Sequence, residues 1–232
     1  MPGMSVLRAA AVAAMLAGAV IPAAAQRTEA RTVQSAADVF QALIAVPEHE
    51  VPAALVRQVE GIAILPGVQR VGFIVGGQRG KGVLVVREGD GSWSRPLFVT
   101  LTGGSVGWQV GIQSADIVLF FRTRESVDRI LRGKYTLGVD ASLAAGSLGR
   151  EAGAVTDQDL QAEIYSYSRT RGIFAGLAVS GAALDVDWDA NALYYGKDIA
   201  RPQDVLVGTG LQDPQSAVRL RQVIAGYLKS VK

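Results

Sequence analysis

Two cations, Arg79 and Lys81, lie within the short glycine-rich segment Gly76–Gly82 (GGQRGKG). Glycines beside a lysine are typical of loops that bind nucleotide phosphates, but the spacing here differs from that motif. Val75 stands where the first glycine belongs, and Gly82 replaces the serine or threonine that follows the lysine. No helix is expected after the segment, so no helix dipole would assist anion binding. We predict a hairpin turn that presents both cations, either to solvent or to a phosphate group beside exposed backbone N–H groups.

The segment Gly103–Gly107 (GGSVG) fits the G-x-S-x-G pattern of a serine nucleophile. Ser105 would need a histidine base, and the single histidine of the chain, His49, precedes it. Hydrolases with this pattern place the histidine last and follow the serine with a helix, whereas a strand is expected after Ser105. We therefore expect no catalytic residue and interpret the segment as a glycine-rich strand connection.

Three carboxylates, Asp185, Asp187 and Asp189, resemble the start of a calcium-binding loop. Ala190 and Gly196 occupy the positions at which that loop needs glycine and glutamate, so the EF-hand motif is absent. A looser calcium site stays open beside a simpler interpretation, in which these carboxylates lie at a strand end and cap a helix. One histidine and no cysteine make a transition-metal site improbable, and no cofactor is expected.

The elements that position these residues are mainly strands, because glycines alternate with β-branched and aromatic residues over Gly61–Gly111. Isolated glycines inside strands indicate bulges or close backbone approach. Strands are expected over Ile62–Leu65, Val71–Gly76, Gly82–Arg87, Leu97–Thr102, Val106–Gly111, Ile117–Phe121, Lys134–Asp140 and Ile164–Ser168. Glu88–Ser92 is predicted to be a hairpin turn, and Ser180-Gly181 to join Ile173–Val179 to Ala182–Val186 in another. Ala141–Gly153 is compatible with a turn and strand or with a helix.

Apolar residues at helical spacing predict helices, and the N-terminal one either packs on the sheet or contacts a membrane. Its low content of lysine and arginine favours packing. The predicted helices cover Gln26–Ala45, Pro52–Glu60, Thr123–Arg132, Asp189–Tyr195 and Pro214–Lys229, with a further turn at Pro202–Leu206; Thr123 and Asp213 are expected to act as caps. The predicted class is α+β, a strongly bent, glycine-rich antiparallel sheet or small barrel packed with N-terminal and C-terminal helices.

Residues 1–25 have the features of a secretory signal peptide. Arg8 precedes the apolar run Ala9–Ile21, and Ala23-Ala24-Ala25 supplies a cleavage pattern before Gln26. The apolar run is shorter than the roughly 20 residues that span a bilayer. We expect cleavage after Ala25, a periplasmic or secreted protein, and a single domain over residues 26–232.

The composition is that of a globular protein, with 49% hydrophobic and 19% charged residues. The net charge of +2 comes without a clustered basic face, so we expect no nucleic-acid partner. The absence of cysteine excludes disulfides and thiolate chemistry.

Several motifs occur in an order that resembles the SYLF family of lipid-binding domains. They are Glu60–Leu65 (EGIAIL), Gly72–Gly82 (GFIVGGQRGKG), Gly103–Gln113 (GGSVGWQVGIQ), Gly133–Asp140 (GKYTLGVD), Glu163–Gly176 (EIYSYSRTRGIFAG) and Asp189–Gly196 (DANALYYG). The resemblance implies non-catalytic binding of membrane lipids, with anionic phospholipids and phosphoinositides as ligands of the eukaryotic members. Eukaryotic members are membrane–actin adaptors that use an N-terminal amphipathic region for membrane contact. Ser35–Glu60 corresponds to that region, and Arg57 is its only lysine or arginine. For an exported chain we expect no actin partner.

These observations predict a periplasmic lipid-binding protein that engages phospholipids or a membrane surface. The expected contacts to lipid phosphate are Arg79 and Lys81 first, then Arg70, Lys134, Arg169 and Arg171, the last two in a second turn beside Tyr165 and Tyr167. An alternative is an envelope protein–protein interaction or structural module with incidental lipid affinity, whose protein partner is unknown. The third hypothesis is an enzyme of unrecognised type, with Ser105 as the residue to test.

Overall fold

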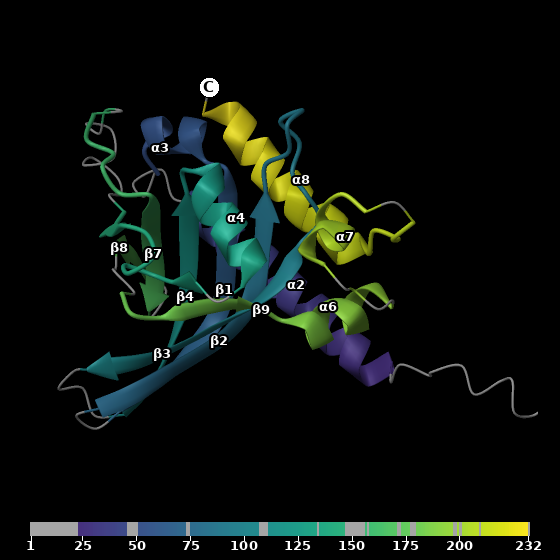
Figure 1. Ribbon diagram of the computed structural model, residues 1–232, viewed down its shortest axis with the longest axis horizontal. Coiled ribbons are helices and arrows are strands. Elements are labelled where there is room, and N and C mark those ends of the chain that lie inside the picture. The colour runs from purple at the N-terminus through teal and green to yellow at the C-terminus, as the bar shows by residue number, and fades with distance from the viewer. Residues whose placement is uncertain are drawn as a thin grey trace, which may run out of the picture.

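The computed structural model describes residues 23–45, 51–72, 75–106, 111–133, 135–146, 156, 158–170, 173–176, 180–196, 199, 201–208 and 210–231. Helices and strands are labelled in Figure 1. The helices in these residues are α2 (Ala23–Ile44), α3 (Ala53–Gln58), α4 (Arg124–Arg132), α6 (Trp188–Tyr195), α7 (Pro202–Leu206) and α8 (Gln215–Ser230). The strands are β1 (Gly61–Gly72), β2 (Val75–Val86), β3 (Leu97–Val106), β4 (Gly111–Phe121), β5 (Tyr135–Thr136), β6 (Leu143–Ala145), β7 (Ile164–Thr170), β8 (Ile173–Gly176) and β9 (Ala183–Val186).

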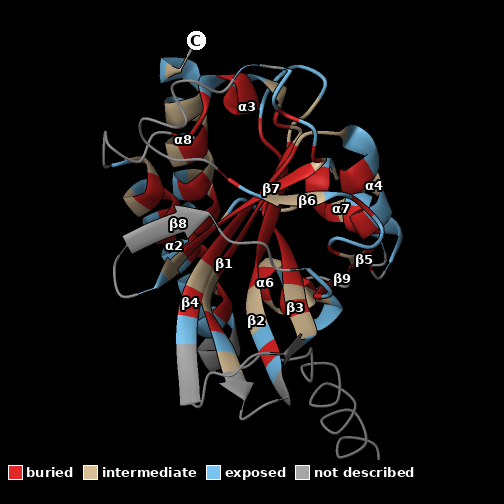
Figure 2. Cartoon of the chain, turned by 90° about the vertical axis from the view of Figure 1, so that its left-hand side faces the viewer, coloured by how far each residue is buried: buried red, intermediate tan, exposed pale blue. Residues whose placement is uncertain are grey.

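The described strands form one sheet with β1 near its middle. Their order is β5-β9-β3-β2-β1-β4-β7-β6, and β8 pairs with β7 off this path. Every strand pair is antiparallel except β6 with β7. The sheet curls strongly, and its strands fan out between two sets of helices (Figure 2). The predicted class, α+β with a strongly bent antiparallel sheet, is therefore confirmed.

Side chains alternate between the two faces of the sheet and build two separate cores. Ile62 and Ile64 of β1 join the core formed with α2, α3, α6 and α8. Ala63 and Leu65 point to the opposite face, where α4 and α7 cover them. Figure 2 shows the buried strands between α2 and α8 on one side and α4 and α7 on the other.

Helices from the two ends of the described chain pack together on one face of the sheet. Phe40 of α2 is fully buried and lies with its ring centroid 6.3 Å from Phe120 of β4 and 6.0 Å from Tyr227 of α8. Val33 and Leu43 of the same apolar stripe are also fully buried. The predicted packing of the N-terminal helix on the sheet is thus confirmed. No helix in the described part of the chain is both long and apolar enough to span a bilayer.

The predicted hairpin turn over Gly76–Gly82 is wrong, because β2 runs straight through it. The register of β1 shifts between Leu65 and Val68, where Gly67 adopts φ +60°. This bulge presses on β2: a Cβ on Gly80 would lie 2.6 Å from Val68 Cγ2, and one on Gly82 would lie 2.7 Å from Leu65 Cα. The glycines of β2 are needed for close backbone approach rather than for a turn.

The predicted hairpin around Ser180-Gly181 is also wrong. β8 pairs with β7 through Thr170 and Ile173, whereas β9 pairs with β3 and β5. Of the predicted strand Lys134–Asp140, the described residues 135–140 contain only the short strand β5, after which Gly138 turns the chain with φ +76°. Of Ala141–Gly153, residues 141–146 are described and contain β6, and the rest lies outside the described residues.

The predicted helices Thr123–Arg132, Asp189–Tyr195, Pro202–Leu206 and Pro214–Lys229 agree with α4, α6, α7 and α8 to within one residue at each end, whereas one predicted cap is wrong. Thr123 caps α4 by accepting a hydrogen bond from Ser126 N at 3.2 Å. Pro214, rather than Asp213, is the N-cap of α8. Asp213 instead forms ion pairs with Arg95 and Arg221.

Candidate ligand-binding groove

A groove of about 910 Å³ lies between α3, the connection from β2 to β3, and α8. Figure 1 shows α3 beside the C-terminal end of α8. Residues from these three segments line it: Val56, Arg57, Arg87, Asp90, Gly91, Ser92, Trp93, Val218, Arg221, Gln222, Ala225, Leu228 and Lys229. Small-molecule sites in proteins commonly have volumes of about 300–1,000 Å³, so the groove has the size of a ligand site.

The lining combines an apolar floor with a basic rim. Its apolar residues are Val56, Trp93, Val218, Ala225 and Leu228, and its charged residues are Arg57, Arg87, Arg221, Lys229 and Asp90. Four cations therefore face one carboxylate. This distribution favours a ligand with an anionic group and an apolar part.

A tight turn holds Trp93 in the wall of the groove. Gly91 N donates to Glu88 O and Glu88 N donates to Ser92 O, both at 2.8 Å, and Gly91 has φ +80°. Hydrogen bonds from Ser92 to the Asp90 carboxylate lower the pKa of Asp90. This confirms the predicted turn over Glu88–Ser92. The turn leaves Trp93 only 7% exposed, so its indole forms part of a fixed surface.

Hydrogen bonds fix part of the basic rim in place. Arg87 Nη1 donates to the carbonyl oxygen of Arg57 at 3.4 Å, which links the end of β2 to α3. Arg221 pairs with Asp213, whose other oxygen accepts from Arg95 Nε at 2.6 Å. Arg221 Nε is buried without a hydrogen-bond partner among the described residues. Lys229 is exposed at the C-terminal end of α8.

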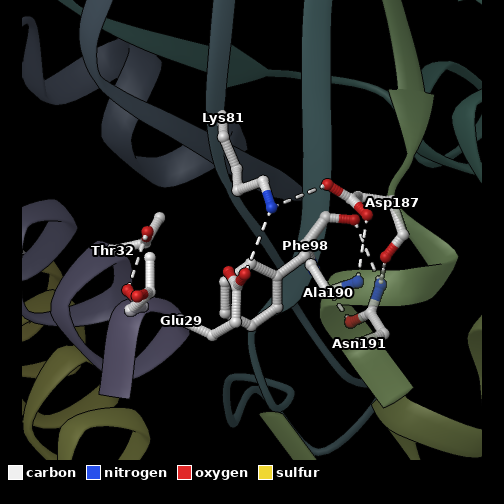
Figure 3. Close-up of polar contacts among 8 residues, drawn as sticks. Glu29, Thr32, Lys81, Phe98, Asp187, Ala190 and Asn191 are labelled. Carbon is white, nitrogen blue, oxygen red and sulfur yellow. Dashed lines mark hydrogen bonds and ion pairs between the residues drawn. The ribbon is translucent and has the colours of Figure 1, made fainter. Parts of the chain in front are cut away.

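The predicted lipid contact Lys81 lies in the middle of β2, between two carboxylates (Figure 3). Its Nζ lies 3.2 Å from Glu29 Oε1 of α2 and 3.2 Å from Asp187 Oδ2 at the start of α6. Burial alone would lower the pKa of Lys81, but the hydrogen bonds and charges of Asp187 and Glu29 outweigh it and raise that pKa. The charge of Lys81 is therefore used to hold α2 and α6 to the sheet.

Asp187 has a second role beside Lys81. Its Oδ1 accepts from Ala190 N at 3.0 Å and so caps α6. The described residues contain no group of three or more histidine, cysteine, aspartate or glutamate residues placed to bind a metal. The sequence left open a loose calcium site or a helix cap for these aspartates, and at Asp187 the structure shows the helix cap.

Asn191 fastens α6 to the edge of β3, as Figure 3 shows. Its Oδ1 accepts from Phe98 N at 2.9 Å, and its Nδ2 donates to Phe98 O at 3.2 Å. The pairing of β3 with β9 begins one residue later, at Val99. The asparagine side chain thus extends the ladder of the sheet.

The other predicted lipid contacts are spread over the sheet. Arg79 is exposed and shares a depression of about 490 Å³ with Lys81, Asp187 and Asp189. Arg169 of β7 binds Asp116 of β4, with Nη2 2.6 Å from Oδ2.

Arg70 of β1 is half-buried, and its Nε has no hydrogen-bond partner in the described part of the chain. Burial lowers its pKa. Lys134 and Arg171 lie outside the described residues. The described sheet therefore brings Arg79 and Lys81 together but gives Lys81 and Arg169 carboxylate partners.

Ser105 does not lie in the strand–turn–helix context of a nucleophile. It belongs to β3, and the next element along the chain is β4. His49 lies outside the described residues.

Comparison with known proteins identifies the family. Residues 102–227 match the Ysc84 family, described as "Las17-binding protein actin regulator". This match covers more than half of the 232 residues. The chain belongs to the Ysc84 family. The resemblance to the SYLF family is thereby confirmed.

Curated relatives of this Ysc84 family member are longer proteins. LAS seventeen-binding protein 3 of Saccharomyces cerevisiae is 36% identical over 152 residues, which make up 64% of this chain and 33% of that protein. An SH3 domain-containing protein of Schizosaccharomyces pombe is 35% identical over 180 residues, or 76% of this chain and 41% of that protein. SH3 domain-containing YSC84-like protein 1 of Homo sapiens is 32% identical over 163 residues, or 70% and 47%. The chain thus spans between a third and about half of these relatives.

The family assignment overturns one prediction. We expected no actin partner, but the family is described as an actin regulator and its yeast relative is named as a Las17-binding protein. These names describe binding and regulation rather than catalysis.

The sequence reasoning missed the groove, although α8 carried a signal for it. Ala217, Leu220 and Ile224 are buried in the core, and Val218, Ala225 and Leu228 form a second apolar stripe beside them, of which Ala225 and Leu228 are half-buried against the same core. When the apolar stripe of a helix is wider than its contact with the core requires, the extra width indicates a second contact surface. The family match over residues 102–227 includes Arg221 but not Arg57 or Arg87. The groove is therefore lined by residues from inside and from outside the matched region.

Proposed function

We propose that this Ysc84 family domain is a non-catalytic lipid-binding domain that engages anionic phospholipid headgroups at a membrane surface. The observation that carries the proposal is the groove, whose described lining combines four cations, Arg57, Arg87, Arg221 and Lys229, and one carboxylate, Asp90, with an apolar floor. Phosphate oxygens are strong acceptors for arginine and lysine, and apolar groups between the cations suit the acyl boundary of a bilayer.

The cations of the groove would contribute a substantial part of the binding free energy. Each lysine or arginine near an anionic leaflet contributes about 1 kcal/mol to binding. A desolvated charge-assisted hydrogen bond to phosphate contributes roughly 1.5–3 kcal/mol. Arg221 pairs with Asp213, so part of its charge is already used within the fold.

The contacts predicted from the sequence form a second, weaker part of the proposal. Arg79 is exposed and stays a headgroup candidate. Lys81 and Arg169 rank lower because each already binds a carboxylate. Arg70, Lys134 and Arg171 complete this second set.

Vesicle flotation tests the proposal. The chain is mixed with phosphatidylcholine vesicles that contain or lack phosphatidylglycerol, at low salt. We expect flotation only with the anionic lipid, and Arg57→Glu with Lys229→Glu to weaken it by about tenfold or more. The matched control reverses two exposed cations elsewhere, Arg132 and Arg201. If both double variants float equally well, the groove is not the headgroup site. If only Arg79→Glu loses flotation, the headgroup site lies among the contacts predicted from the sequence.

We also propose that the protein is exported to the periplasm after cleavage behind Ala25. The apolar run Ala9–Ile21 and the alanines before Gln26 support this. α2 begins at Ala23, so cleavage there would remove only the first three residues of the helix. Intact-mass measurement of the protein from a periplasmic fraction should give a chain that begins at Gln26. A full-length mass in the cytoplasmic fraction would contradict export.

A second candidate function is docking of an actin-regulatory protein. The family description and the name of the yeast relative, which state Las17 binding, favour it. Co-sedimentation with filamentous actin and binding to immobilised Las17 would test it directly. Binding to either at micromolar concentration, together with failure to float with anionic vesicles, would favour this function over lipid binding.

A further inference from the structure

We propose that the groove between α3 and α8 takes up one single-chain anionic amphiphile, with its alkyl chain on the floor and its head at the basic end. This rests on the proposed function, because the same rim would meet the headgroups of a bilayer. It goes further in that the ligand is a lipid molecule removed from the bilayer rather than the membrane surface.

The shape of the floor fits a chain. Val218 and Leu228 lie ten residues apart on α8, which corresponds to about 15 Å along the helix. Ala225 lies between them, and Val56 of α3 and Trp93 of the β2–β3 connection contribute the other walls. Arg221 and Gln222 also line this length of α8, so an extended alkyl chain would lie on the three apolar residues and beside the stems of these two side chains.

The walls are already formed, which keeps the entropic cost of binding low. Trp93 is 7% exposed and Val56 is 4% exposed, and both belong to the core that α2 and α8 share with the sheet. The turn at Glu88–Ser92 fixes the approach of Trp93 through two backbone hydrogen bonds. The apolar surface is therefore a rigid part of the fold.

Charge selects the head of the ligand. Arg87 donates a hydrogen bond to the carbonyl oxygen of Arg57, and both line the groove with Arg221 and with Lys229, which follows Leu228 near the end of α8. Figure 1 shows α3 beside this end of α8. A carboxylate or phosphate head finds cations of α3, the β2–β3 connection and α8 in this lining, whereas a quaternary ammonium head is repelled by them.

Tryptophan fluorescence tests this inference on the full chain. Trp108→Phe with Trp188→Phe leaves Trp93 as the only tryptophan. This variant is titrated, below the critical micelle concentration of each probe, with laurate, lysophosphatidylglycerol, dodecyl maltoside and dodecyltrimethylammonium. We expect a saturating change at one molecule per chain for the anionic probes, and weaker or no change for the others. The comparison of laurate with lysophosphatidylglycerol separates a carboxylate from a phosphate head.

Two substitutions locate the ligand in the groove. Leu228→Gln should weaken binding of the anionic probes by about tenfold, since it places an amide on the apolar floor. Val207→Gln changes an apolar side chain that is 61% exposed outside the groove and should leave binding unchanged. Thermal unfolding of both variants checks that they are folded. Equal binding of neutral and anionic probes, a stoichiometry well above one, or an unchanged Leu228→Gln variant would each overturn the inference.

Flotation with diacyl anionic vesicles, run in parallel, separates this inference from the proposed function. Flotation without uptake of single-chain probes overturns the inference and leaves headgroup binding intact. Uptake of the probes without flotation supports the inference and removes membrane docking. If the chain captures a protein partner but neither floats with vesicles nor takes up a probe, both this inference and the proposed lipid binding are overturned.

Discussion

Lys81 Nζ lies 3.2 Å from Glu29 Oε1, which ties the centre of strand β2 to helix α2 across 52 positions of the sequence. The Glu29 side chain is only 6% exposed, and its second oxygen has no hydrogen-bond partner among the described residues. Asp187 approaches the same ammonium at 3.2 Å. A single lysine thus pairs with two carboxylates where α2, α6 and the sheet meet.

Removing this lysine should destabilise the fold. Lys81→Met leaves Glu29 charged and buried without a counter-charge, a loss that costs about 3–5 kcal/mol for a fully buried pair. We expect about 2 kcal/mol here, because the Lys81 side chain is 39% exposed and solvent screens part of the charge. Urea unfolding measures the free energy. Asp128→Asn, which breaks the exposed pair with Arg124, should cost less than about 0.5 kcal/mol and serves as the control. Equal losses in both variants would show that the Glu29 pairing adds nothing.

The same contact predicts a pH dependence at high pH. The pKa of Lys81 is raised in the folded chain above its ordinary value of 10.5. A lysine whose pKa is raised on folding stabilises the folded chain by its full amount at pH values below the pKa of the unfolded chain. This contribution is lost as the pH rises through the pKa of the folded chain. The stability advantage of the wild type over Lys81→Met should therefore be constant from pH 7 to 9 and shrink above about pH 10.5. Urea midpoints of both proteins at several pH values measure it, and an advantage that persists above the folded pKa would contradict the role of the charge.

Gly82→Ala should disrupt the centre of the sheet. The added Cβ would meet Leu65 Cα at 2.7 Å and would overlap the Ile64 carbonyl oxygen, both backbone atoms that cannot move aside. We expect a loss of about 3 kcal/mol, the upper end of the usual cost of overpacking. Gly89→Ala is the matched control, since a Cβ there meets no atom within 4 Å. Thermal unfolding should show a large fall in Tm for the first variant and almost none for the second.

Asn191→Ala should cost about 2–3 kcal/mol, because it leaves the buried N–H of Phe98 without its acceptor. Asn191 is fully buried, so water does not replace the lost bonds. Hydrogen exchange should show faster exchange of the Phe98 amide relative to Val83 in the middle of β2. Protection of Phe98 as strong as in the wild type would mean that Asn191 does not extend the strand ladder.

Much of the fold followed from local sequence patterns. α2, α4 and α8 have apolar stripes at helical spacing, and their ends agree with the prediction to within a few residues. The alternation of Ile62, Ala63 and Ile64 between two cores is likewise a local property of a strand.

Other features depend on contacts that no local pattern encodes. Gly80 and Gly82 suggested a turn, yet they lie opposite the bulge that begins after Leu65, and only the pairing of β1 with β2 reveals this. The carboxylates of Glu29 and Asp187 lie far from Lys81 in the chain, so its burial and pairing were not predictable from GGQRGKG. The groove escaped prediction for the same reason, since Arg57, Arg87 and Lys229 come from three separate segments.

The packing of α2 against α8 sets an order of events during synthesis. Phe40, near the start of the described chain, contacts Tyr227, near its end, so this core closes only when the last helix has left the ribosome. Until then the apolar face of β1 and β4 stays open to solvent and to chaperones. The core that α2 shares with the sheet therefore stays incomplete until α8 has left the ribosome.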